Sequence, residues 1–304
     1  MTLALACFNL LTMFKCIGIC SVCLQDMSIF QPNRGFLNMP DIDCRKDPPF
    51  LIILVTTLHN QIKTRMAIRE TWGKERIITD KRIMTFFLLG STSYPHDEIT
   101  VTMESFIYKD IIQKDFLDTY YNLTLKTLMG LEWVHRFCPQ SSFVMKTDSD
   151  MFVNPLFLTE LLLKKNRTTR FFTGALTMHS NPVRDPKSKW YVSKEEYPWN
   201  KYPNCCSGAA YVFSTDVASH MYIVSKKTPF LKLEDIFVGL CLFQLKIKLE
   251  ALHSEPVFFV GRIEFSPCRY RRLVTSHFIT PAEMLAFWRE LEKSIDEECP
   301  GTHS

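Results

Sequence analysis

A continuous apolar run over Phe50–Leu58 limits this chain to a small set of folds. Such a run predicts a strand that is buried on both faces, as in the parallel sheets of α/β proteins. Two more buried strands are predicted at Met84–Leu89 and Ser142–Thr147, and helices at Asn60–Trp72 and Leu123–Phe137 alternate with them. This alternation predicts one α/β domain with a central, mostly parallel sheet.

The second half of the chain continues the pattern. Asn154, a capping residue, precedes Pro155 and predicts a helix that runs to Lys165. Residues 181–204 are rich in Pro, Trp, Tyr and Lys and predict a long loop, a kind of segment that often carries function in compact domains. The remaining predicted elements are strands at 170–176 and 208–213, a helix at 216–226, and a C-terminal helix with an apolar stripe of Met284, Trp288, Leu291 and Ile295.

Residues 1–24 have a composition that is typical of a membrane span. The stretch is about as long as a bilayer crossing requires, although Lys15 is costly at mid-span. No alanine-rich cleavage site follows, which predicts a retained signal-anchor rather than a cleaved signal peptide. Residues 25–49 contain several prolines and no apolar period, and are predicted to be a stem or linker. The catalytic domain is then expected to span residues 50–304.

Cysteines and glycosylation sequons indicate the compartment. Seven of the eleven cysteines lie beyond the apolar segment and predict a disulfide framework with one thiol left over, as in an oxidising compartment. Sequons at Asn122 and Asn166 predict N-glycosylation and agree with a secretory-pathway lumen. The net charge of +4 is mild, so nucleic acid is not an expected partner.

The segment Lys146-Thr147-Asp148-Ser149-Asp150-Met151 is the sharpest local signal for chemistry. Two carboxylates at i and i+2 share one face of an extended chain, and they come directly after a buried strand. Nucleotides bind at such strand ends in open α/β sheets. Carboxylate oxygens suit Mn²⁺ or Mg²⁺ on a diphosphate. The alternative is an Asx turn that closes the strand.

Another acidic pair, Glu234-Asp235, opens an apolar helix over Ile236–Leu245. One of these acids is a candidate general base, because a hydroxyl that attacks in a transfer reaction must lose its proton. The alternative is that both only favour the helix dipole. His277 follows an apolar run and is either a metal ligand or a core histidine. P-loop, dinucleotide-binding, zinc-protease and nucleophile-elbow motifs are absent from the sequence.

Many ordered segments resemble the beta-1,3-glycosyltransferase family of the Golgi, over nearly all of residues 45–290. The segments, in chain order, are Arg65-Met-Ala-Ile-Arg69-Glu-Thr-Trp72-Gly73, Phe87-Leu-Leu-Gly90, Asp110 to Asp118, Tyr121-Asn-Leu-Thr-Leu-Lys126, Lys146 to Asn154, Tyr202-Pro203, Gly208 to Ser214, Glu234-Asp235-Ile-Phe-Val-Gly239 and Ser276-His277-Phe278.

This resemblance implies a GT-A fold and a single-pass type II Golgi membrane protein with a luminal catalytic domain. It implies UDP-galactose as donor and terminal beta-linked GlcNAc as acceptor, giving a Gal-beta-1,3-GlcNAc (type 1) chain, with GalNAc-terminated glycolipids as further acceptors. Asp148 and Asp150 match the family's metal motif, and Mn²⁺ is the expected ion. Asp235 matches the proposed catalytic base, and His277 matches a C-terminal metal-binding histidine.

Further residues are expected around the two substrates. Those expected at the nucleotide sugar are Arg65, Arg69, Lys146 and Asp148, although both arginines could instead form structural ion pairs. The candidates for contact with the acceptor are Trp199, Tyr202 and Glu234, with core packing as the alternative for the two aromatic residues.

One departure from the family pattern concerns the donor site. The family's Gly-x-Gly-Tyr reads Gly208-Ala209-Ala210-Tyr211 here, and a methyl group there is expected to crowd the backbone or forbid a positive φ. It is the only support for an inactive relative that acts as a chaperone or sugar-binding module. A beta-1,3-N-acetylglucosaminyltransferase is the other alternative. A glycosidase is disfavoured, because Asp148 and Asp150 are too close to flank a glycosidic bond.

Overall fold

Seven strands in the described part of the chain form one sheet, in the order β2-β3-β1-β5-β8-β7 with β4 also paired to β3. The computed structural model describes residues 35–178, 180–295 and 297–299. The strands are β1 Leu51–Thr56, β2 Arg76–Ile78, β3 Lys81–Ser91, β4 Ile111–Leu117, β5 Phe143–Asp148, β7 Phe172–Thr177 and β8 Cys205–Ser214.

The centre of the sheet is parallel and its edges are not. β1 runs parallel to both β3 and β5, and β4 runs parallel to β3. β2 is antiparallel to β3, β8 to β5, and β7 to β8. The predicted α/β, GT-A-type class is therefore confirmed, with a sheet that is mixed.

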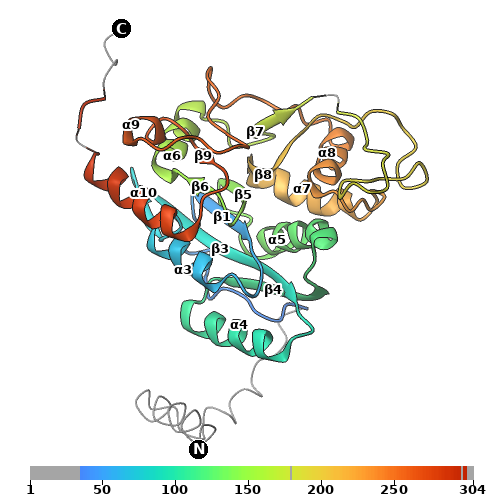
Figure 1. The fold of residues 1–304 in the computed structure, drawn as a ribbon, viewed down its shortest axis with the longest axis horizontal. Helices are drawn as coiled ribbons and strands as arrows, with labels where there is room; N and C mark the ends of the chain where they lie inside the picture. Colours follow the sequence, from blue (N-terminus) through green and yellow to red (C-terminus); the bar gives the residue numbers. More distant parts are fainter. Residues whose placement is uncertain (1–34, 179, 296, 300–304) are drawn as a thin grey trace, which may run out of the picture. The chain divides into compact units, whose positions relative to one another are not determined.

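Helices cover both faces of this sheet (Figure 1). Leu51, Ile53 and Val55 of β1 belong to the core cluster that includes residues of α3, α4, α6 and α10. On the other face, Leu54 of β1 lies against Gly130 of α5. The helices are α3 Ile62–Glu70, α4 Pro95–Tyr108, α5 Leu123–Phe137, α6 Pro155–Lys165, α7 Thr215–Ser225, α8 Glu234–Gln244, α9 Pro267–Tyr270 and α10 Pro281–Lys293.

Capping explains which helix boundaries were predictable. The Asn154 side chain accepts a hydrogen bond from the Phe157 backbone N–H, and α6 has the bounds that the Asn-Pro pair predicts. The helix predicted to begin at Asn60 begins at Ile62, because Gln61 is the N-cap of α3. Ile295 lies beyond α10 and is 53% exposed, so it is not part of the buried stripe.

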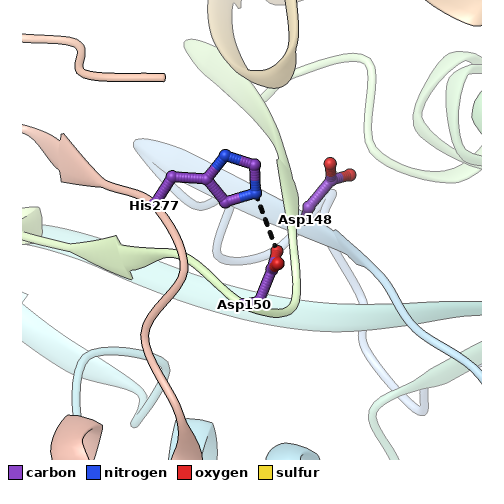
Figure 2. Close-up of side chains that lie close together, drawn as sticks. All are labelled: Asp148, Asp150 and His277. Atoms are coloured by element: carbon purple, nitrogen blue, oxygen red, sulfur yellow. Dashed lines mark ion pairs between the residues drawn. The ribbon is translucent and has the colours of Figure 1, made fainter. Parts of the chain in front are cut away.

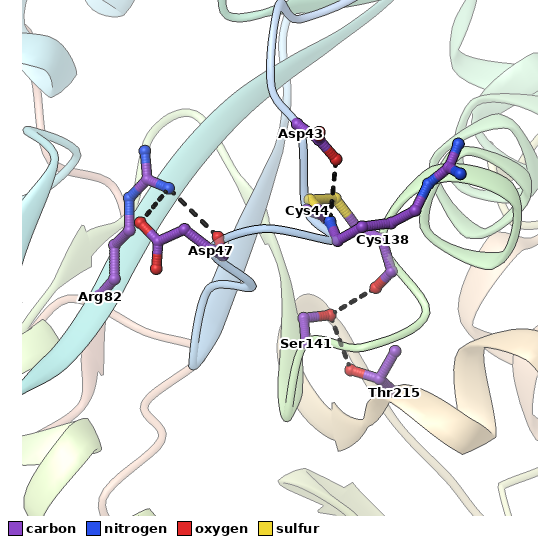
Figure 3. Close-up of a disulfide and its surroundings, with 8 residues drawn as sticks. Asp43, Cys44, Asp47, Arg82, Cys138, Ser141 and Thr215 are labelled. Carbon is purple, nitrogen blue, oxygen red and sulfur yellow. Dashed lines mark hydrogen bonds and ion pairs between the residues drawn. A yellow bond between two sulfur atoms is a disulfide. The ribbon is translucent and has the colours of Figure 1, made fainter.

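The compact unit of the structure begins at Asn38, before the boundary predicted at residue 50. A disulfide joins Cys44 to Cys138, just after α5, as Figure 3 shows. The Asn38 backbone pairs with Gln113 of β4. Residues 38–49, predicted as linker, are therefore tied to the catalytic domain.

The predicted signal-anchor at residues 1–24 lies outside the described residues. Among the described residues, the helices are too short or too polar to cross a membrane.

Two disulfides lie in the described part of the chain, Cys44–Cys138 and Cys268–Cys299. The other three cysteines of the described chain, Cys205, Cys206 and Cys241, are free and buried. The prediction of a single leftover thiol is therefore wrong. Burial raises the pKa of the Cys205 thiol to about 12, so it stays protonated and unreactive at neutral pH.

Removal of the Cys44–Cys138 bridge should destabilise the domain more than removal of Cys268–Cys299. The bridges close loops of 94 and 31 residues, which the chain-entropy relation converts to about 4.7 and about 3.7 kcal/mol. Denaturant unfolding of the two double Cys→Ala variants measures both values. A larger loss for Cys268Ala/Cys299Ala would show that loop entropy does not dominate.

The two predicted glycosylation sequons differ in their surroundings. Asn166 is exposed at the C-terminal end of α6. Asn122 is partly exposed, and its side-chain Nδ2 donates a hydrogen bond to the Leu117 carbonyl at 2.8 Å. A glycan on Asn122 would replace one of the two Nδ2 hydrogens on a side chain that this bond already holds against the chain, whereas Asn166 is exposed, so we expect Asn166 to be modified more completely.

Candidate active site

The predicted metal-binding turn lies at the carboxyl end of β5. Thr56 of β1 is directly opposite Asp148 of β5, so two parallel strands end at the same edge. The Thr56 hydroxyl donates to Asp148 Oδ1 at 2.7 Å, and Lys146 Nζ donates to the same oxygen at 2.6 Å. These two bonds hold the Asp148 carboxylate in place and leave its other oxygen for a cation.

A two-stranded sheet brings His277 to this turn. β6 (Phe152–Val153) pairs antiparallel with β9 (Thr275–Ser276), so the residue after β9 meets the residues before β6. His277 Nε2 lies 3.2 Å from Asp150 Oδ1, as Figure 2 shows. One ligand atom from each of Asp148, Asp150 and His277 lies within 4.8 Å of the other two. The structure thus brings together the three predicted metal ligands.

The hydrogen bonds of His277 prepare one nitrogen for a metal. Its Nδ1 lies 3.0 Å from the Val260 carbonyl, which can only accept, so Nδ1 carries a proton and Nε2 is the coordinating atom. The hydrogen bond with Asp150 raises the pKa of His277. Burial opposes ionisation of Asp150, but the bond to His277 lowers its pKa overall. Two carboxylates and an imidazole fit a divalent ion such as Mn²⁺.

The N-terminus of α8 forms a second acidic part of the site. Glu234 is buried, and its Oε1 accepts hydrogen bonds from the Tyr211 hydroxyl and, at 2.9 Å, from Thr127. Asp235 is partly exposed, and its Oδ1 accepts the Ile236 N–H at 2.9 Å. Of the two acids, Asp235 is therefore the one that a substrate can reach.

Burial changes the proton affinities of this acidic pair. It raises the pKa of Asp235 above the ordinary aspartate value and also raises the pKa of Glu234. A raised pKa makes the Asp235 carboxylate a stronger base, as a general base requires. Exposure thus distinguishes Asp235 from the buried Glu234, and the role of Asp235 as general base stays a prediction.

Lys146 connects the metal turn to the acidic pair. Its buried ammonium group donates to Asp148 Oδ1 and to the carbonyl of Gly208 in β8. Burial alone would lower the pKa of Lys146, but the carboxylates of Asp148 and Glu234 raise it above the ordinary value. The lysine therefore places a fixed positive charge between the two acidic groups.

The predicted donor-site arginines form the ion pairs that were their alternative interpretation. Arg65 is fully buried and pairs with Glu104 at 2.6 Å, and it also donates to the Leu58 and His59 carbonyls in the loop after β1. Arg69 pairs with Glu104 and Asp110. Arg65 therefore holds the loop that follows β1, and Arg69 joins α3 to α4 and to the residue before β4. Donor binding by either arginine stays a prediction.

The predicted loop at residues 181–204 is ordered by one arginine. The Arg184 guanidinium donates to the carbonyls of Val192, Ser193, Tyr197 and Trp199. Trp199 is 64% exposed, whereas Tyr202 is buried. The exposed Trp199 ring is thus free to stack on a sugar, while Tyr202 packs against Tyr197 inside the loop.

The two alanines in place of the family pattern lie in regular strand. Ala210 pairs with Thr147 of β5, and both alanines belong to the buried core. Positive φ values among the described non-glycine residues do not include Ala209 or Ala210. The expectation that a methyl group forbids the backbone conformation is therefore wrong.

Gly208→Ala is expected to lower kcat by about tenfold with little change in stability. A Cβ at this position would lie 3.1 Å from Glu234 Oε2, which is a tight contact, and 3.6 Å from Asp235 Cβ, which is an ordinary one. The Glu234 carboxylate would therefore have to shift, and this shift would disturb the neighbouring base Asp235. Steady-state kinetics and thermal unfolding measure the two effects. Gly261→Ala is the matched control, because its Cβ would meet no described atom within 4 Å. Equal kinetics for the two variants would contradict the prediction.

Sequence reasoning missed the residues that hold these groups in place. Thr56, Thr127 and Tyr211 bond to Asp148 or Glu234 but belong to no recognised catalytic motif. Thr56 could have been identified from the sequence as a candidate site residue, because it is the polar residue that ends a buried strand. Tyr211 belongs to the segment Gly208-Ala209-Ala210-Tyr211 that matches a family motif, but its bond to Glu234 was not predicted. Thr127 had no signal, since its contact joins segments far apart in sequence.

Comparisons with known proteins agree with this geometry. Residues 63–253 match the family described as Galactosyltransferase. The chain is 61% identical to human beta-1,3-galactosyltransferase 5 over 272 residues, which cover 90% of this chain and 88% of the relative. It is 55% identical to the mouse protein of that name (90% and 89% covered), and 44% identical to mouse beta-1,3-galactosyltransferase 1 (86% and 80% covered). The chain is a glycosyltransferase and belongs to the galactosyltransferase family.

Proposed function

We propose that this protein transfers galactose from UDP-galactose to O3 of a terminal beta-linked GlcNAc, with inversion at the anomeric carbon. The observation that carries the proposal is the cluster of Asp148, Asp150 and His277 at one sheet edge, linked through Lys146 to Asp235. The names of the relatives support the sugar and the linkage. GalNAc-terminated glycolipids are further acceptors under this proposal.

Asp235 provides the proton acceptor of the reaction. As the acceptor O3 attacks the anomeric carbon, its proton passes to an Asp235 oxygen, and the bond from that carbon to the UDP oxygen breaks. The donor linkage is alpha, so a single in-line displacement gives a beta product. No covalent intermediate with the enzyme is needed.

Asp148, Asp150 and His277 would hold the divalent cation. When bound, such an ion neutralises the diphosphate and stabilises the departing UDP as a Lewis acid. The protein contributes the fixed orientation of its ligands, through the bonds from Thr56 to Asp148 and from His277 to Val260. Trp199 offers an exposed ring face for the acceptor sugar.

The proposed setting is the Golgi lumen, with residues 1–24 as a type II signal-anchor. The two disulfides support an oxidising compartment for residues 38–299. Nucleic acid has no role in the proposal.

A transfer assay tests the proposed function. The purified full chain in detergent is incubated with a GlcNAc-terminated acceptor, with Mn²⁺ or EDTA, and with either UDP-galactose or UDP-GlcNAc. We expect a beta-1,3-galactosylated product only with UDP-galactose and Mn²⁺. Transfer in EDTA would remove the metal site from the proposal. Transfer from UDP-GlcNAc alone would identify an N-acetylglucosaminyltransferase, and no transfer from either donor would favour an inactive relative.

A further inference from the structure

A second hollow lies in the C-terminal part of the domain. It is an open pocket of about 630 Å³ between the segment 256–266, the short helix α9 and the Cys268–Cys299 disulfide. The described residues that line it do not include Asp148, Asp150, His277 or Asp235. A volume of this size is in the range of small-molecule sites, and the proposed transfer reaction does not use it.

Three arginines line the pocket: Arg262, Arg269 and Arg272. Arg269 donates to the Glu264 carbonyl, while the Glu264 carboxylate stays 3.9 Å away and is 91% exposed. The Arg272 side chain is exposed, and no described residue gives its guanidinium a hydrogen bond or an ion pair. Two of the three guanidinium groups are thus available to an anion.

The third arginine has a fixed position. Arg262 pairs with Glu283 at the start of α10 and donates to the Phe278 carbonyl. The three arginines of the pocket contribute three positive charges, and the nearby carboxylates of Glu264 and Glu283 contribute two negative charges. The net charge of the pocket is therefore positive, and Arg262 keeps its orientation without a ligand.

Apolar side chains line the pocket as well. Phe259 and Ile263 are partly exposed and lie among the lining residues, together with Leu273. A bare phosphate or sulfate ion would use only the arginines. A sugar ring that bears a carboxylate or a sulfate would use both features: its anion pairs with guanidinium groups, and its aliphatic C–H face packs on Phe259.

The same segment also supports the metal site. His277 Nδ1 bonds to the Val260 carbonyl, and the His277 N–H donates to the Gly261 carbonyl. Val260 and Gly261 lie between the lining residues Phe259 and Arg262. A glycan held in the pocket would therefore lie against the segment that positions His277.

We propose that this pocket binds an acidic sugar residue, carrying a carboxylate or a sulfate, of a glycan substrate. The arginines and apolar side chains that line the pocket are the evidence for an acidic sugar as its ligand. That the sugar belongs to a substrate rests on the proposed function.

Direct binding tests the pocket without any transfer reaction. Isothermal titration of the full chain would use 3′-sialyllactose and 3′-sulfolactose, with neutral lactose and sodium sulfate as comparisons. We expect both acidic saccharides to bind, and lactose and sulfate each to bind at least tenfold more weakly. In Arg269Gln/Arg272Gln the affinity for the acidic saccharides should fall at least tenfold, while Arg289→Gln, an exposed arginine of α10 outside the pocket, should bind as the parent does.

Each other outcome overturns the proposal. If lactose binds as tightly as sialyllactose, the negative charge of the ligand does not contribute to its affinity. If sulfate binds as tightly as the acidic saccharides, the pocket is a site for a bare anion. Unchanged affinity in the double variant, with circular dichroism confirming its fold, would place the binding elsewhere. Because this measurement needs no UDP-galactose, its result does not depend on the transfer assay, and failure of the pocket can be distinguished from failure of the proposed function.

Discussion

Asp235→Asn is expected to lower kcat by roughly a hundred- to ten-thousandfold, the contribution that a positioned general base makes. The amide has the same shape as the carboxylate but cannot take the proton of the acceptor hydroxyl. Its Oδ1 can still accept the Ile236 N–H, so α8 should begin as before. UDP binding should persist, because Asp235 is not among the three candidate metal ligands. Steady-state kinetics and calorimetric titration with UDP measure the two quantities.

The pH profile gives a second readout for Asp235. Burial raises the pKa of its carboxyl group, and the base works only when ionised. In the parent enzyme kcat/KM should therefore fall as the pH drops through that raised pKa, and this acid limb should vanish in Asp235→Asn. Normal turnover in the variant would remove Asp235 as the base.

Asp148Asn/Asp150Asn is expected to reduce transfer by roughly a thousandfold, the equivalent of several kcal/mol of lost charge stabilisation. Two of the three candidate ligands lose their negative charge, while His277 and the strand pairing of β5 remain. The thermal stabilisation that Mn²⁺ gives to the parent should also disappear. Differential scanning fluorimetry with and without Mn²⁺ measures this loss apart from activity.

A matched control separates the loss of the site from a general loss of acidic charge. Asp80 is exposed in the turn between β2 and β3, with a left-handed backbone that asparagine adopts readily. Asp80→Asn should keep both transfer and Mn²⁺ stabilisation. If Mn²⁺ stabilises the double variant as strongly as the parent, the ion binds elsewhere.

Local signals predicted the elements that bury a continuous apolar run or carry a strong cap. β1, β3 and β5 lie where such runs occur, and α5 and α6 have the predicted bounds. No element was predicted for α4 or β4. α4 exposes apolar side chains such as Ile99, Met103 and Phe106, so its pattern does not show a polar outer face.

In the candidate site, too, the residues with a local sequence signal were predictable and those placed by long-range contacts were not. The turn at Asp148 and Asp150 could be predicted because both carboxylates follow one strand within three residues. The sequence alone did not decide whether His277 is a metal ligand or a core histidine, because its position depends on the pairing of β6 with β9. Each of these strands has only two residues, and they lie more than a hundred residues apart in the chain. Such long-range pairing has no local sequence signal.

The pairing of β6 with β9 also determines when the candidate metal site can form during protein synthesis. During synthesis, residues 148 and 150 leave the ribosome well before residue 277, and only the arrival of β9 beside β6 completes the ligand set. A chain that stops early, or whose C-terminal segment fails to dock, would have both aspartates but lack the histidine. Under the proposed function, metal binding would thus require a completely folded domain, and partly made chains would not react with nucleotide sugar.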